Sequence, residues 1–126
     1  MTTTHRVIVA DDDADIRSLI GIAVEKSGLR LVASVADGAS ALAAIREHVP
    51  DLAILDVAMP ELTGLEVCSA VRQDPSLDEV RILLLSASVD EASQTVGIAA
   101  GADYFLAKPF SPRELAAWLA GGKEPR

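Results

Sequence analysis

The chain has 126 residues, half of them apolar, which suffices for a single domain with a sizeable core. Nineteen acidic residues outnumber eleven basic ones, and this net charge of −8 argues against a surface that binds nucleic acid or an anionic membrane. The single cysteine excludes a disulfide framework, and no apolar run approaches membrane-spanning length. We therefore expect a cytoplasmic protein with one domain in residues 1–120 and a tail or linker stub in residues 121–126.

Short apolar runs alternate with amphipathic helical patterns along the whole chain. The predicted strands are residues 6–10, 29–36, 52–56, 81–85 and 104–107. Apolar residues recur at helical spacing in residues 16–24, 41–49, 65–71 and 112–119, whereas residues 90–100 predict a weaker helix that is rich in alanine and contains Gly97. Five strands alternating with five helices predict an α/β fold, in which helices cover both faces of a parallel sheet. Of the doubly wound strand orders, the flavodoxin-like order 2-1-3-4-5 suits a chain of five strands.

Polar side chains stand at the ends of four predicted strands. Asp11 and Asp12 follow the first strand, and Asp56 ends the third. Ser86 follows the fourth strand and Lys108 the fifth. In open α/β sheets, ligands bind outside the carboxyl ends of the strands. We therefore expect these five side chains to meet in one crevice.

The three carboxylates in this crevice would repel one another. Two unit charges 4 Å apart cost about 4 kcal/mol at an effective dielectric of 20. A divalent cation relieves this repulsion, and Mg²⁺ suits an oxygen-rich site with few protein ligands. Lys108 adds a fixed cation and Ser86 a hydroxyl donor, which together suit a phosphoryl group in transfer. Our hypothesis is that Asp56 accepts a phosphoryl group.

Several short motifs stand in a fixed order around these positions: Asp11-Asp12-Asp13, Leu55-Asp56 with Met59-Pro60 and Gly64, Leu85-Ser86-Ala87, Gly101-Ala102-Asp103, and Lys108-Pro109-Phe110. Each motif alone is a weak signal, but together they cover residues 6–119. With these motifs the chain resembles the receiver domain of two-component response regulators, such as the chemotaxis regulators. The resemblance implies a switch protein rather than an enzyme, with only its own phosphorylation and autodephosphorylation as chemistry.

The resemblance also assigns roles to individual residues. It implies that Asp56 takes its phosphoryl group from a histidine kinase or a phosphotransfer protein. It implies a Mg²⁺ site made by Asp12 directly, Asp11 through water, Asp56, and the backbone carbonyl of Ala58. It further implies that Ser86 and Lys108 each bind a phosphoryl oxygen.

The same resemblance makes expectations about switching. It implies a cis peptide bond between Lys108 and Pro109, and it places Phe105 with Ser86 in the position of an aromatic switch. Phe105 could equally be simple packing, and the residues alone leave this open. Phosphorylation would change the face formed by the fourth helix, fifth strand and fifth helix. This face would contact an effector domain or protein, or form a dimer.

Two other functions compete with this one. A small phosphatase of the haloacid dehalogenase type would use Asp11 as its covalent residue, since Asp11-Asp12-Asp13 contains an Asp-x-Asp motif at a strand exit. That assignment leaves Asp56 without a role. A pseudo-receiver that only binds partners is the third possibility, and the complete acidic set argues against it. We expect no direct contact with nucleic acid or membrane, and either a stand-alone receiver or one cut from an effector domain.

Overall fold

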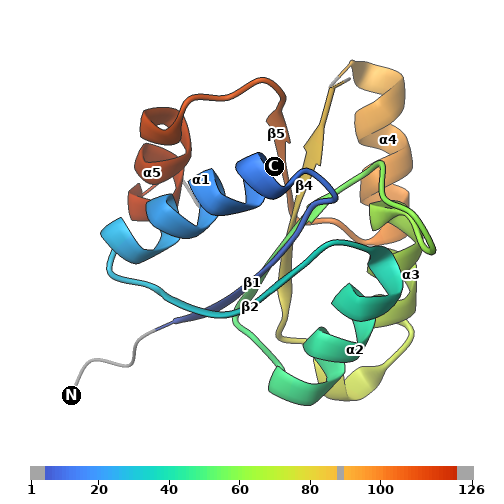
Figure 1. Cartoon of the computed structure of the whole chain (residues 1–126). Coiled ribbons are helices and arrows are strands. Elements are labelled where there is room, and N and C mark those ends of the chain that lie inside the picture. The colour runs from blue at the N-terminus through green and yellow to red at the C-terminus, as the bar shows by residue number, and fades with distance from the viewer. Residues whose placement is uncertain (1–4, 88–89, 122–126) are drawn as a thin grey trace.

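The computed structural model describes residues 5–87 and 90–121, which form a five-stranded parallel sheet flanked by helices (Figure 1). The strands are β1 (Arg6–Ala10), β2 (Arg30–Val35), β3 (Leu52–Asp56), β4 (Arg81–Ser86) and β5 (Tyr104–Ala107). The helices are α1 (Ala14–Lys26), α2 (Gly38–His48), α3 (Gly64–Arg72), α4 (Glu91–Ala100) and α5 (Pro112–Gly121). The strand order is β2-β1-β3-β4-β5, which confirms the predicted fold class and topology.

Side-chain caps explain where several helices begin. The carboxylate of Asp13 accepts hydrogen bonds from the backbone N–H groups of Asp15 and Ile16, so it caps α1. Thr63 and Glu66 form a reciprocal capping box at the start of α3. Asp13 is therefore occupied as a cap, whereas its two preceding neighbours remain in the turn between β1 and α1.

The boundaries of a few elements differ from the prediction. β4 includes Ser86, because the carbonyl of Ser86 accepts a hydrogen bond from the N–H of Lys108 at 2.8 Å and extends the sheet. A short 3₁₀ helix, η1 (Pro75–Leu77), was not predicted, and Asp74 caps it. Helix α5 runs through Gly121, the first residue of the predicted tail or linker stub. Residues 122–126 of that tail lie outside the described residues.

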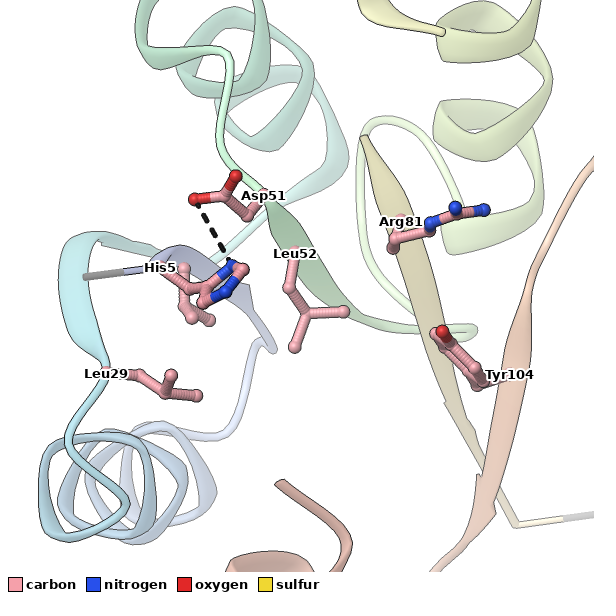
Figure 2. A pocket seen from close by; sticks show the side chains of 7 residues that line it. His5, Leu29, Asp51, Leu52, Arg81 and Tyr104 are labelled. Atoms are coloured by element: carbon pink, nitrogen blue, oxygen red, sulfur yellow. Dashed lines mark ion pairs between the residues drawn. The ribbon is translucent and has the colours of Figure 1, made fainter. Parts of the chain in front are cut away.

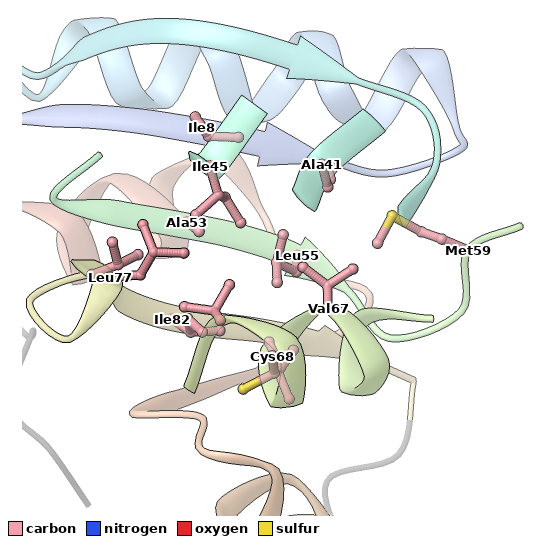
Figure 3. Close-up of a cluster of buried hydrophobic side chains, with 14 residues drawn as sticks. Ile8, Ala41, Ile45, Ala53, Leu55, Met59, Val67, Cys68, Leu77 and Ile82 are labelled. Carbon is pink, nitrogen blue, oxygen red and sulfur yellow. The ribbon is translucent and has the colours of Figure 1, made fainter. Parts of the chain in front are cut away.

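Alternate residues along each strand point to opposite faces of the sheet and form two apolar cores. One core joins the sheet to α2 and α3, with strand residues such as Ile8, Leu55 and Ile82 against Val67 and Cys68 (Figure 3). The other core joins the opposite face of the sheet to α1 and α5. Each fully buried Leu or Ile stabilises the fold by about 1.5–3 kcal/mol relative to its exposure to water. This packing fixes the strands whose ends carry the polar residues.

None of the described helices is both long enough and apolar enough to cross a membrane.

Candidate functional site

Asp56 is the last residue of β3 and is 5% exposed. After it, the N–H of Val57 donates to the carbonyl of Leu85, and the N–H of Gly64 donates back to the carbonyl of Val57, both at 2.9 Å. A Cβ on Gly64 would collide with the backbone carbonyl of Asp56, so the chain needs glycine to approach this closely. The loop between β3 and α3 therefore folds tightly against the C-terminal end of β3, where the Asp56 carboxylate lies.

Asp11 and Asp12 follow β1, which lies beside β3 in the sheet. Carboxylate oxygens of Asp11, Asp12 and Asp56 all lie within 4.8 Å of one another. Asp11 is fully buried, whereas Asp12 is exposed at the mouth of the cluster. Clustered carboxylate oxygens with access to solvent are the ligands that a hard divalent cation prefers. The residues present thus fit a divalent cation, and we call Asp11, Asp12 and Asp56 the acidic cluster.

Lys108 reaches into the acidic cluster from the end of β5. Its Nζ lies 3.1 Å from Oδ2 of Asp11 and 3.4 Å from Oδ1 of Asp56. Burial alone would lower the pKa of Lys108, but the hydrogen bonds and negative charges of Asp11 and Asp56 outweigh it, so the pKa is raised. Lys108 is therefore a permanent cation at neutral pH, positioned between two buried carboxylates.

Desolvation and the nearby charge of Asp11 raise the pKa of Asp56 above its ordinary value. Lys108 opposes this shift by its charge and hydrogen bond, and the backbone N–H of Ala58 opposes it with a further hydrogen bond. Ala58 thus lies beside the Asp56 carboxylate and contributes backbone groups there. A carboxylate that water solvates poorly gains more from any new cation or electrophile than an exposed one does.

Ser86 and Phe105 line the other side of the site. With Val57 and residues of α4, they border an apolar cavity of about 250 Å³. Ser86 is the last residue of β4 and pairs with Ala107 of β5 in the sheet. The structure therefore brings all the predicted strand-end residues together at the carboxyl ends of the strands. The Lys108–Pro109 bond is cis, which confirms that prediction.

A larger cavity of about 300 Å³ lies at the opposite edge of the sheet (Figure 2). It is bordered by Leu52, Arg81 and Tyr104, which open strands β3, β4 and β5, and by His5 and Asp51. His5 and Asp51 lie 3.9 Å apart there. Because all strands run in the same direction, this cavity and the acidic cluster lie at opposite ends of the sheet, and the cavity has no part in the site.

Sequence reasoning missed the partners of the Gly101-Ala102-Asp103 motif. The carboxylate of Asp103 accepts hydrogen bonds from Arg72 at 2.7 Å and from the N–H of Ile82 at 2.9 Å. Arg72 also donates to the carbonyl of Gly101 at 2.9 Å. The motif therefore ties α3 to the loop that leads into β5. Arg17, which also contacts the site, was missed because an arginine one turn into a helix carries no distinct sequence signal.

Comparisons with known proteins agree on one family. Residues 7–120 match the profile of the response regulator receiver domain. The chain is 38% identical over 116 residues to the DNA-binding response regulator MtrA of Mycobacterium tuberculosis, covering 92% of this chain and 49% of MtrA. It is 41% identical over 111 residues to the transcriptional regulatory protein GltR of Pseudomonas aeruginosa, covering 88% and 46%. The chain spans about half the length of the curated relatives it matches.

Solved structures give the same result. The receiver domain of the response regulator NarL from Mycobacterium tuberculosis superposes with a TM-score of 0.88 at 32% identity, covering 99% of this chain and 100% of that one. The chemotaxis regulator CheY4 of Vibrio cholerae superposes with a TM-score of 0.87 at 33% identity, covering 93% and 97%.

The chain belongs to the receiver domain family of response regulators. Receiver domains are phosphoacceptor switches in two-component signal transduction, and this is the function of the chain. The alternative of a haloacid dehalogenase-type phosphatase is not supported. In the structure, both carboxylate oxygens of Asp11 are already paired, one with the N–H of Asp13 and one with Lys108. A covalent role would have to displace these partners.

Proposed function

We propose that Asp56 is the residue that becomes phosphorylated, with a phosphohistidine of a histidine kinase or phosphotransfer protein as donor. The observation that carries this proposal is the position of Lys108, whose Nζ lies between the carboxylates of Asp11 and Asp56. A cation fixed beside a buried carboxylate is placed to meet the charge of an incoming phosphoryl group. Asp11, Asp12, Asp56 and the backbone carbonyl of Ala58 would hold Mg²⁺.

In the reaction, a carboxylate oxygen of Asp56 forms a bond to phosphorus while the P–N bond of the donor breaks, and the freed imidazole keeps the electron pair. Mg²⁺, when bound, neutralises charge on the oxygens of the transferring group. Lys108 exchanges its contact with Asp56 for a phosphoryl oxygen, and the hydroxyl of Ser86 donates to another. Desolvation of Asp56 favours the attack, because a poorly solvated carboxylate is a stronger nucleophile than one in water, and the charge that the phosphoryl group adds lies on oxygens that Lys108 would meet.

The output of the switch is also a proposal. Ser86 and Phe105 border one cavity with α4 residues, so a movement of Ser86 toward the phosphoryl group reaches Phe105 and the face formed by α4, β5 and α5. That face would then bind an effector domain or protein, or a second copy of the chain. We propose that the protein is cytoplasmic and that its only chemistry is its own phosphorylation and dephosphorylation. We also propose that it makes no direct contact with nucleic acid or membrane.

The test is phosphorylation by acetyl phosphate with Mg²⁺, followed by borohydride trapping and peptide mass mapping. We expect the trapped residue to be Asp56, with no label in EDTA and none in the Asp56→Asn variant. Asp78→Asn is the matched control, because Asp78 is an exposed aspartate at the end of η1 and its substitution changes the charge equally. Label at Asp11, or label that persists in Asp56→Asn, would overturn the proposal.

A further inference from the structure

We infer that Arg17 is a positioning residue of the acidic cluster, which clamps the turn between β1 and α1 so that Asp12 is presented to a divalent cation. This inference rests on the proposed function, since it concerns the same metal site. It assigns a role to a residue outside the motifs, on the first turns of α1.

Arg17 holds the turn at two points. Its Nη1 donates to the backbone carbonyl of Asp11 at 2.7 Å. Its backbone N–H donates to the carbonyl of Asp13 at 3.0 Å, as the first hydrogen bond of α1. Asp12 therefore sits between two carbonyls that are both held by the same residue. The exposed carboxylate of Asp12 has little packing of its own, so its direction depends on the backbone that Arg17 fixes.

The Arg17 contact completes the hydrogen bonding of Asp11. The N–H of Asp11 donates to the carbonyl of Val35, its Oδ1 accepts from the N–H of Asp13, and its Oδ2 accepts from Lys108. The backbone carbonyl is the remaining polar group of this fully buried residue, and Arg17 satisfies it. Without Arg17 this carbonyl would lose its partner at the hinge of the turn.

Arg17 does this without consuming a carboxylate. Within residues 5–87 and 90–121, it forms no ion pair with an acidic side chain, because its guanidinium is directed at a backbone carbonyl. Its positive charge still lies beside a turn of three aspartates and lowers their mutual repulsion. The carboxylate of Asp12 therefore stays available as a ligand, which would not hold if Arg17 formed a salt bridge with it.

The test measures Mg²⁺ binding by isothermal titration calorimetry, together with thermal unfolding in EDTA. Arg17→Met removes the hydrogen-bond donors of the side chain but keeps an unbranched side chain there, and Arg17→Lys keeps the charge and one donor group. Arg30→Met removes an exposed arginine of β2 and is the matched control. We expect Arg17→Met to weaken Mg²⁺ binding about tenfold, as is typical for residues that orient metal ligands. Arg17→Lys should recover part of this loss, and Arg30→Met should bind as the unaltered protein does.

The outcomes separate this inference from the proposed function. Equal Mg²⁺ affinity in Arg17→Met and Arg30→Met would overturn the role of Arg17, while the labelling of Asp56 would stand. If the unaltered protein binds no Mg²⁺ at millimolar concentration, the proposed function itself fails. If Arg17→Met does not fold, Arg17→Lys is compared with Arg30→Lys instead. A loss of Mg²⁺ affinity in Arg17→Lys alone supports the positioning role of Arg17, and equal Mg²⁺ affinities in the two variants overturn it.

Discussion

The ring of Phe105 occupies the space that a side chain at Gly97 would need. A Cβ placed on Gly97 would collide with Cζ and Cε1 of the Phe105 ring. Gly97 is also the only residue of α4 that is buried, while Val96 and Ile98 on either side are more than half exposed. The helix therefore packs on the sheet through a glycine, and Phe105 fills the contact.

We predict that Gly97→Ala destabilises the protein by about 1 kcal/mol, although alanine ordinarily favours a helix over glycine by about that amount. The reason is overpacking against Phe105, which costs about 1–3 kcal/mol. In the background of Phe105→Leu, whose side chain lacks the far end of the ring, the same substitution should become stabilising. Chemical denaturation of the four proteins measures both effects. A stabilising Gly97→Ala in the unaltered background would contradict the prediction.

Asp56→Asn should make the protein more stable at neutral pH in the absence of Mg²⁺. The pKa of Asp56 is raised by burial and by Asp11, so its ionised form costs stability above the folded-state pKa. That cost fades as the pH falls toward the ordinary value of 3.8, and the advantage of the variant should fade with it. A gain of about 1 kcal/mol would raise Tm by about 4 °C.

Thermal unfolding between pH 4 and pH 8 in EDTA checks this, with Asp78→Asn as the control. Mg²⁺ should narrow the difference in thermal stability between Asp56→Asn and the unaltered protein, because the cation binds the acidic cluster of the unaltered protein better. A variant that is less stable than the unaltered protein at pH 7 would show that the ion pair with Lys108 outweighs the desolvation of Asp56.

Lys108→Met should destabilise the protein by about 3 kcal/mol at pH 7, because it leaves the buried carboxylates of Asp11 and Asp56 without their cation. The raised pKa of Lys108 means that its stabilising effect is fully present below the ordinary lysine value of 10.5, and is lost as the pH rises through the folded-state pKa. Denaturant unfolding at several pH values, with Lys26→Met as an exposed control, measures this. Added Mg²⁺ should restore part of the loss; no response to Mg²⁺ would argue that the cation does not enter the acidic cluster.

Cys68 should be inert toward thiol reagents in the folded protein. It is fully buried on the side of α3 that faces the sheet, and burial raises the pKa of its thiol to about 11. Because the thiolate is the reactive species, only about one thiol in a thousand is ionised at pH 8. Labelling with a chromogenic disulfide should therefore be slow in buffer and immediate in denaturant. Rapid labelling in buffer would reveal local opening of the core around α3.

The strands and the candidate site residues were predictable because both depend on local sequence. Runs of apolar residues predicted β1, β3 and β5 with their observed bounds. Since parallel strands share one direction, the residues that follow them must meet at one edge, and this placed Asp12, Asp56 and Lys108 together. Helix α4 was the weakest prediction, because its buried residue is Gly97, which hydrophobic periodicity does not detect.

By itself, the sequence determined the alternation of strands and helices, the order of the sheet and the edge that carries the chemistry. Only the tertiary structure decided which atoms meet there: that Lys108 lies between Asp11 and Asp56, that Arg17 holds the turn around Asp12, and that Phe105 fills the space at Gly97. The physical reason is that strand and helix patterns arise from neighbours along the chain, whereas these contacts depend on distances and rotamers that packing sets across elements far apart in sequence.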